Sequence, residues 1–206
     1  MMHELKVLLD QDEVLQRLKR EGAFAQIPML QDDGLLFLAK TVLDRKVSKV
    51  LEIGCAQGYS AIALHRLTKV EIWTIEREFS LCEIAQKNVT QAGLSDVIHV
   101  ICGDALFIHT ESFPIFDLIF IDAAKAQYQR FFQKFSPLLS SNGCIVTDNL
   151  SFHGLVETMA PYLTRNQKAI ARKIKGFTTW LESHDEFETT YHNIGDGMSL
   201  SQRIKG

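Results

Sequence analysis

Five short apolar runs constrain the fold of this chain more than any other feature of its sequence. In chain order they are VLEI, EIWTI, VIHVI, FDLIFI and CIVT, and segments of helical length separate them. Such runs are too short for buried helices and are typical of strands that are covered on both faces. Strands that alternate with helices form βαβ units, so the pattern predicts an α/β fold with a mostly parallel sheet.

The sequence on either side of these runs follows other patterns. Residues 1–46 carry apolar positions at helical spacing and predict N-terminal helices, with Asp32 and Asp33 as candidate caps. Thr164 is a candidate cap of a late helix, and FETTYHNI and MSLSQRI around GDG predict a closing antiparallel hairpin. The first helical stripe is broken and is formed by Leu5, Leu8, Leu9, Val14, Leu15 and Leu18, and the late helix has Ile170, Ile174, Phe177 and Leu181 on one face.

Composition narrows the class of protein further. With 206 residues, 46% of them hydrophobic, the chain can bury a full core, and no stretch has the composition of a linker. We therefore expect a single domain over residues 1–206, with a Rossmann-like core at 47–206. The net charge of −3 provides no general attraction to nucleic acid, and the charged N-terminal stretch predicts neither a signal peptide nor a membrane span.

The four cysteines are far apart in the sequence, and none belongs to a CxxC pair. This spacing argues against a zinc site and against a disulfide framework. Free cysteines are commonly buried, so we expect buried thiols in a protein of the reducing cytoplasm. The residues concerned are Cys55, Cys82, Cys102 and Cys144.

Polar residues follow two of the apolar runs. Asp122 and Lys125 come directly after FDLIFI, and Asp148 and Asn149 come directly after CIVT. Open α/β sheets bind their ligands at the carboxyl ends of their strands. Two carboxylates and an amide oxygen form a hard ligand set that suits Mg²⁺ or a similar divalent cation. The pattern predicts a metal-assisted transfer enzyme, although a surface lysine and a loop cap are the alternative interpretations.

A glycine-rich turn, GCAQG, follows the first apolar run. Gly54 and Gly58 lie in this turn, Glu76 ends the second run, and Asp104 follows the third. A glycine turn and acids at neighbouring strand ends suit an adenosine-bearing ligand, although the glycines alone could serve packing. The turn is not GxGxxG and offers no cation to a pyrophosphate, which favours S-adenosylmethionine over NAD and disfavours a dehydrogenase.

Several motifs in order carry a family resemblance. LEIGCAQGYSAIAL, IWTIER, GDAL, IFIDAAKAQYQRFF, TDNLSFHG and IGDGMSL resemble the cation-dependent O-methyltransferases related to catechol and caffeoyl-CoA O-methyltransferases. The resemblance covers the chain from about Gln26 onward and implies a class I methyltransferase fold with a seven-stranded sheet. Within this group, DAAKAQYQRFF, DNLSFHGLV and the closing GDG look most like bacterial tRNA 5-hydroxyuridine methyltransferases. These enzymes form 5-methoxyuridine at the wobble position, and the resemblance also implies a homodimer.

The resemblance implies roles for individual residues. The metal ligands match Asp122, Asp148 and Asn149, and the catalytic lysine matches Lys125, with Asp122 beside it in the reaction. Catechol O-methyltransferases carry a glutamate after their DGL motif, where this chain has Ser199, so a catechol is a less favoured acceptor. The cofactor-binding positions match Glu52, Gly54, Gly58, Tyr59, Ser60, Glu76, Asp104, Ala105 and Asp122.

A basic stripe bears on the acceptor. Four cations at helical spacing follow Pro161 and could bind the phosphates of the tRNA anticodon region, although a solvated helix face is the alternative. We therefore expect tRNA as the substrate, with a small phenolic or catechol-like molecule as the alternative acceptor. His153 is a further candidate for the acceptor pocket. The stripe consists of Arg165, Lys168, Arg172 and Lys175.

Overall fold

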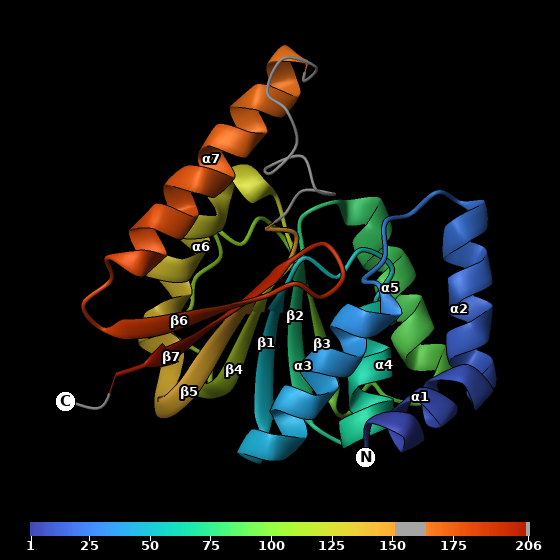
Figure 1. Ribbon diagram of the computed structural model, residues 1–206. Helices are drawn as coiled ribbons and strands as arrows, with labels where there is room; N and C mark the ends of the chain where they lie inside the picture. Colours follow the sequence, from blue (N-terminus) through green and yellow to red (C-terminus); the bar gives the residue numbers. More distant parts are fainter. Residues whose placement is uncertain (151–163, 205–206) are drawn as a thin grey trace.

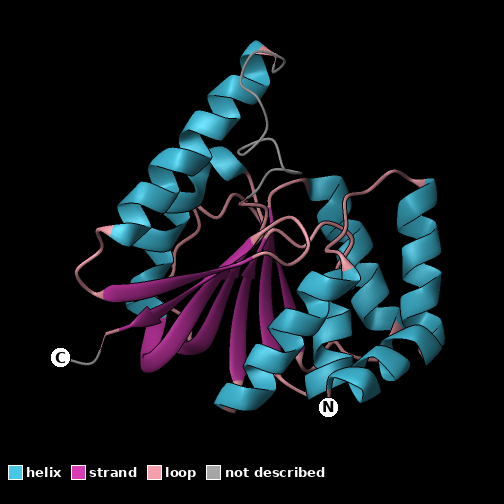
Figure 2. Ribbon diagram, viewed as in Figure 1, coloured by secondary structure: helices cyan, strands magenta, loops and turns pink. Residues whose placement is uncertain are grey.

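A seven-stranded sheet forms the centre of the molecule in the computed structural model, which describes residues 1–150 and 164–204 (Figure 2). The strand order is β3-β2-β1-β4-β5-β7-β6. The first five strands are parallel, whereas β7 pairs antiparallel with both β5 and β6. The strands are β1 (Lys49–Ile53), β2 (Glu71–Glu76), β3 (Ile98–Cys102), β4 (Phe116–Ile121), β5 (Leu139–Thr147), β6 (Phe187–His192) and β7 (Met198–Arg203).

This topology confirms the predicted α/β fold and its closing hairpin. All five apolar runs form strands, and the direction of the strand order reverses between β1 and β4. Such a reversal opens a crevice at the carboxyl ends of the two strands, where doubly wound folds bind ligands.

Helices cover both faces of the sheet (Figure 1). One face carries α1 to α5, and the other carries α6 and α7. The short 3₁₀ helices η1 (Lys125–Gln127) and η2 (Ser136–Leu138) flank α6. The helices are α1 (Met2–Gln11), α2 (Glu13–Phe24), α3 (Asp32–Arg45), α4 (Tyr59–Thr68), α5 (Phe79–Gln91), α6 (Tyr128–Phe135) and α7 (Arg165–Glu182).

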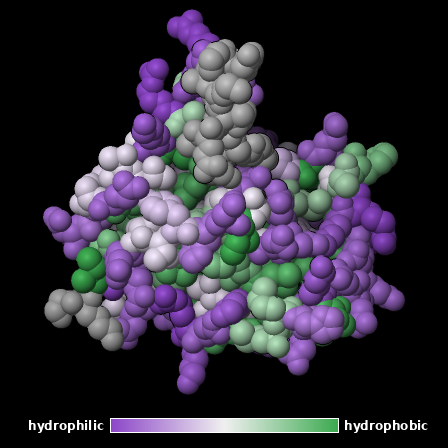
Figure 3. Space-filling model, viewed as in Figure 1, coloured by the Kyte–Doolittle hydropathy of each residue, from purple (hydrophilic) through white to green (hydrophobic). Residues whose placement is uncertain are grey.

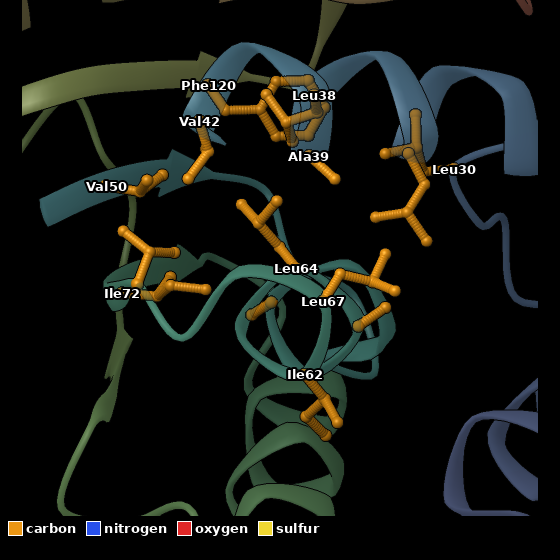
Figure 4. Close-up of a cluster of buried hydrophobic side chains, with 14 of the residues drawn as sticks. Leu30, Leu38, Ala39, Val42, Val50, Ile62, Leu64, Leu67, Ile72 and Phe120 are labelled. Atoms are coloured by element: carbon orange, nitrogen blue, oxygen red, sulfur yellow. The ribbon is translucent and has the colours of Figure 1, made fainter. Parts of the chain in front are cut away.

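Each face of the sheet has its own apolar core. On the first, Leu38 and Val42 of α3 lie close to Leu64 of α4, Ile72 of β2 and Phe120 of β4 (Figure 4). On the second, side chains of α6 and α7 such as Phe132 and Phe177 pack over β4 and β5. Because each fully buried side chain of this size contributes about 1.5–3 kcal/mol, the two cores hold the strand ends in fixed positions.

The N-terminal helices differ in detail from the prediction. The predicted break in the stripe lies at Asp12, whose side chain caps α2 by accepting a hydrogen bond from the amide of Leu15 at 3.0 Å. Leu8 was expected to belong to the stripe but is 54% exposed, whereas Leu5 and Leu9 of the same helix are buried. Asp32 and Asp33 lie inside the first turn of α3 and do not cap it, although acids there still favour the positive end of the helix dipole.

Thr164, in contrast, caps α7 as predicted. Its hydroxyl accepts a hydrogen bond from the backbone amide of Gln167. The side-chain oxygen of Gln167 accepts one from the backbone amide of Thr164, which completes a capping box. The predicted apolar face of this helix is buried at Ile174, Phe177 and Leu181.

The prediction of four free thiols is wrong for two of them. Cys82 of α5 and Cys102 at the end of β3 form a disulfide, because α5 packs beside β3 and brings their Cα atoms within 5.6 Å. Cys55 and Cys144 are free and buried, as predicted. In the part of the chain that the structure describes, no helix has the length and apolar character needed to cross a membrane.

Candidate active site

The carboxyl ends of the central strands stop at one level. The amide of Asp122, just after β4, donates to the carbonyl of Ile53 in β1 at 3.0 Å. The amide of Asp148, just after β5, donates to Ile121 in β4 at 3.1 Å. Each acid therefore occupies the first position beyond its strand, and the backbone ladder fixes both side by side at the edge of the sheet.

The turn after β1 comes very close to these acids. Gly54 has a φ of +92°, and a Cβ atom there would lie 2.3 Å from the carbonyl oxygen of Asp122. Only glycine permits this conformation and this approach. Gly58 has a different role. A Cβ atom there would lie 3.3 Å from the Cβ atom of Ala85 in α5, so the glycine lets that helix pack against the start of α4.

A cavity of about 830 Å³ lies over these strand ends. This volume is within the usual range for sites that bind small molecules and cofactors. Its wall comes from segments that are far apart in the sequence. They are residues 28–31, the turn and helix start at 53–57 and 59–60, and residues 75–78, 81, 103–106, 122–125, 127, 131 and 148–149, with Asp196 from the β6–β7 turn.

The four residues predicted to carry the chemistry meet in this cavity. Asn149 is central: its Nδ2 donates to Asp122 Oδ1 at 2.9 Å and to Asp148 Oδ2 at 3.2 Å. Its Oδ1 accepts from Lys125 Nζ at 3.0 Å. Lys125 begins η1, so the short helix directly after β4 turns the ammonium back towards the two acids.

Burial dominates the electrostatics of the cluster. Burial first, and then the neighbouring charge of Glu52, raise the pKa of Asp122 to about 7. Burial also raises the pKa of Asp148 to about 7, with the charge of Asp122 as the next cause. The pKa of Lys125 is lowered by burial, against the opposing effect of Asp196 and the two other acids. Two buried carboxylates side by side favour any ligand that brings positive charge.

The oxygens of this cluster fit a divalent cation. Asp148 Oδ1 is buried and receives no hydrogen bond from the described residues. Carboxylate and amide oxygens such as those of Asp122, Asp148 and Asn149 are the hard ligands that Mg²⁺ prefers. In this structure the Asn149 amide turns its Nδ2 to the two acids and its Oδ1 to Lys125, so a half-turn of the amide is needed to bring its oxygen to the side of the acids. Among the described residues, no group of three or more His, Cys, Asp or Glu side chains forms a metal site.

The acids of β2 and β3 lie along the other part of the cavity. Glu76 ends β2, and its carboxylate accepts the amides of Ala56 at 2.9 Å and Glu78 at 2.8 Å. Asp104 accepts the amide of Leu106 at 2.9 Å. Both carboxylates are thus held in place by backbone donors while they line the cavity. Gly54, Tyr59, Ser60 and Ala105 line it as well.

Two of the predicted cofactor-binding residues do not line the cavity. Glu52 is only 3% exposed, accepts the hydroxyl of Thr74 at 2.5 Å and lies behind the glycine turn. Its burial raises its pKa to about 7. Gly58 is likewise outside the lining. Glu52 belongs to β1 and Gly58 precedes α4, so both adjoin residues that line the cavity without lining it themselves.

The architecture and the cavity point to one family. A sequence model of the O-methyltransferase family matches residues 6–204. The chain belongs to the O-methyltransferase family.

Curated relatives and solved structures agree with this assignment. The chain is 27% identical to a caffeoyl-CoA O-methyltransferase of Populus kitakamiensis, over 90% of this chain and 82% of the relative. It is 33% identical to a catechol O-methyltransferase of Niastella koreensis, over 54% and 53% of the two chains. A candidate caffeoyl-CoA O-methyltransferase from Staphylococcus aureus superimposes with a TM-score of 0.89 at 27% identity, covering 98% of both chains.

A further similar structure is that of a methyltransferase with SAH bound. The SAH-bound methyltransferase PaMTH1 of Podospora anserina has a TM-score of 0.83 and 25% identity to this chain. The alignment covers 97% of this chain and 93% of that one. The likeness therefore extends through nearly the whole of both proteins.

Two residues of the O-methyltransferase cavity had no role in the sequence prediction. Asp196 lines the cavity from the β6–β7 turn, and the motif GDG was the only sequence feature that pointed to this position. Gln57 lies between Gly54 and Gly58 and is buried at 2% exposure, although its surroundings have no local sequence signal.

The basic residues of α7 lie apart from the cavity. All four are exposed and none lines it, and hydrophilic side chains gather along this helix at the upper left of Figure 3. The stripe is therefore a surface of the O-methyltransferase and no part of its pocket. His153 lies outside the described residues.

Proposed function

We propose that this O-methyltransferase transfers a methyl group from S-adenosylmethionine, with the help of a divalent cation, to the 5-hydroxyl of 5-hydroxyuridine in tRNA. The product would be 5-methoxyuridine at the wobble position. The observation that carries the proposal is the meeting of Lys125 with Asp122, Asp148 and Asn149 in one cavity beside Glu76 and Asp104.

The shape of the cavity supports S-adenosylmethionine as the methyl donor. Asp104 and Ala105 line the part suited to the adenine, and Glu76 offers its carboxylate to the ribose hydroxyls. Tyr59 and Ser60 line the part nearer the acids, where the methionine end would lie. A buried set of carboxylates also suits a sulfonium and its ammonium group better than a phosphate.

Asp122, Asp148 and Asn149 would hold the cation, most simply Mg²⁺. When bound, such an ion lowers the pKa of a coordinated hydroxyl and orients it. Lys125 would take the acceptor's proton, because its burial lowers the pKa of its ammonium and Asn149 fixes its Nζ.

In the transfer itself, the acceptor oxygen bonds to the methyl carbon as the bond between that carbon and sulfur breaks. The hydroxyl proton passes to the Lys125 amine, and the donor leaves as S-adenosylhomocysteine. Holding the two reactants in line within one cavity can contribute on the order of 7–11 kcal/mol to such a reaction.

Two features favour tRNA as the acceptor. The exposed cations Arg165, Lys168, Arg172 and Lys175 form a stripe on α7 that suits a phosphate backbone. Ser199 of β7 is fully buried and, being a serine, has no carboxylate of the kind that holds the second hydroxyl of a catechol. A small phenolic molecule is the alternative acceptor, favoured by the caffeoyl-CoA and catechol enzymes among the relatives.

The test uses tRNA from cells that lack the final methylation. The purified protein is incubated with this tRNA, S-adenosylmethionine and Mg²⁺, and nucleosides are analysed by mass spectrometry. We expect 5-hydroxyuridine to become 5-methoxyuridine, and we expect EDTA or Asp122→Asn to block the conversion. Conversion that persists with EDTA would contradict the role of the cation.

If the protein binds S-adenosylmethionine but converts no 5-hydroxyuridine, tRNA is not the acceptor and a phenolic molecule becomes the proposed acceptor. A panel of catechols and hydroxycinnamoyl thioesters would then be assayed with the same protein. We further propose that the enzyme works as a cytoplasmic homodimer, which sedimentation at several protein concentrations would test.

A further inference from the structure

Gln57 connects more parts of the molecule than any other side chain of the glycine turn. Its Nε2 donates to the carbonyl of Leu18 in α2 at 3.0 Å and contacts Met29 Sδ at 3.1 Å. Its backbone carbonyl accepts a hydrogen bond from Nδ2 of Asn88 in α5 at 2.9 Å. Because the residue is only 2% exposed, the Nε2 donor depends on these protein partners instead of bulk water.

Met29 belongs to the segment 28–31, which forms one wall of the cavity and connects α2 to α3. The neighbouring Leu30 is anchored in the core between α3 and α4 (Figure 4). Gln57 is thus the polar contact by which the cofactor turn is fixed to α2 and to this wall. Through the Gln57 side chain, α2 is therefore in contact with the turn that lines the cavity.

The packing around the Gln57 amide leaves no spare room. A Cβ atom on Gly22 of α2 would lie 2.3 Å from Gln57 Nε2 and 2.8 Å from Met29 Sδ. The glycine is therefore a requirement of the contact with Gln57, although alanine is the better helix former at an interior helix position.

Other contacts hold α2 in place independently of Gln57. Lys19 forms an ion pair with Asp32 at 2.7 Å and lies 5.9 Å over the ring of Tyr59. Asp12 forms an ion pair with Arg66 of α4 at 2.7 Å. Loss of the Gln57 amide should consequently leave the N-terminal helices docked.

We infer that Gln57 is a positioning residue for the methyl donor: through Leu18 and Met29 it sets the distance between the glycine turn and the wall at 28–31. The inference rests on the proposed function for the identity of the ligand. A turn that is free to move relative to that wall would bind the donor more weakly, while the acids that carry out the chemistry stay in position.

The first test replaces the amide with an apolar side chain of similar length. Gln57→Met should raise the Kd and the KM for S-adenosylmethionine about tenfold, the effect of one lost buried hydrogen bond. The kcat at saturating donor should stay within about twofold. Gln16→Met is the matched control, because Gln16 Nε2 also donates to a helix carbonyl, that of Leu9, but lies away from the cavity.

Two further variants separate positioning from stability. Gly22→Ala should weaken donor binding through displacement of the Gln57 amide, even though it favours the helix. Gln57→Glu should bind the donor poorly at neutral pH, where a carboxylate faces the Leu18 carbonyl. It should recover relative to the wild type at low pH, where the protonated acid can donate, and Gln57→Met should show no such recovery.

The outcomes distinguish this inference from the proposed function. If the wild type binds S-adenosylmethionine and Gln57→Met binds it equally well, the inference is overturned and the proposed function stands. A fall in melting temperature shared with Gln16→Met, without a change in Kd, would also overturn it. If the wild type itself does not bind S-adenosylmethionine, both the proposed methyl donor and the inference about Gln57 are wrong.

Discussion

Burial gives Glu52 an unusual titration behaviour at the scale of a single residue. Its pKa is raised from 4.5 to about 7, so the folded protein holds this proton more tightly than the unfolded chain does. The free energy of unfolding should therefore fall as the pH rises from about 4.5 to 7 and then stay level. For this one group the loss is on the order of 3 kcal/mol.

Denaturant unfolding at a series of pH values, with EDTA present, would measure this dependence. Glu52→Gln should flatten the curve between pH 4.5 and 7, because it removes the titrating group while it keeps an acceptor for Thr74. Asp122 and Asp148 should contribute slope of the same sign, since burial also raises their pKa to about 7. An unchanged slope in Glu52→Gln would contradict the assignment.

Lys125 should affect the chemical step much more than the binding of the donor. Lys125→Met removes the proton acceptor and should lower the single-turnover rate about 10²- to 10⁴-fold. The Kd for S-adenosylmethionine should change little, because Lys125 lies at the end of the cavity that holds Asp122 and Asn149. Rapid-quench kinetics with saturating donor measures this rate, and exposed Lys87→Met serves as the control.

At the scale of elements, the disulfide fixes α5 to β3. Cys82 and Cys102 are 20 residues apart in sequence, and a crosslink of this length stabilises a protein by about 3 kcal/mol in the chain-entropy model. Reduction with a phosphine should lower the free energy of unfolding by a similar amount. The double variant Cys82→Ser/Cys102→Ser should show the lower stability with or without reductant, whereas Cys144→Ser should keep the response to reductant.

The stripe on α7 should govern the affinity for tRNA and its dependence on salt. Replacing Arg172 and Lys175 with glutamate should weaken tRNA binding and reduce the slope of log K against log salt by roughly two. Methylation of a free nucleoside, if it occurs, should be unaffected. Lys173→Glu changes the same kind of charge beside the stripe, and an equal effect there would show that only net charge matters.

For the molecule as a whole, the sequence was most informative where pattern and burial coincide. The five apolar runs became β1 to β5, and their hydrophobic residues are largely buried except in the edge strand β3, which is mostly half-buried. Asp122 and Asp148 were correctly placed together, since the carboxyl ends of parallel strands meet at one edge. The predicted contacts of Glu76 and Asp104 with the cavity follow from the same rule.

Tertiary packing decided the features that the sequence did not reveal. The disulfide depends on how α5 lies beside β3, and no spacing rule links positions 82 and 102. Leu8 belongs to the predicted apolar stripe, yet it is exposed while Leu5 and Leu9 of the same helix are buried. The role of Gln57 depends on a helix almost forty residues earlier in the chain. The expectation of a reducing compartment relied on four free thiols, and the disulfide removes half of that support.

The position of β7 has a consequence for synthesis of the protein. β7 follows β6 in the chain, yet it lies between β5 and β6 in the sheet, and the turn before it brings Asp196 to the cavity. On the ribosome, β6 has no edge to join until β7 has emerged and paired with β5. The wall around the acids is therefore completed only once β7 has been translated, and the nascent chain holds no finished pocket before that moment.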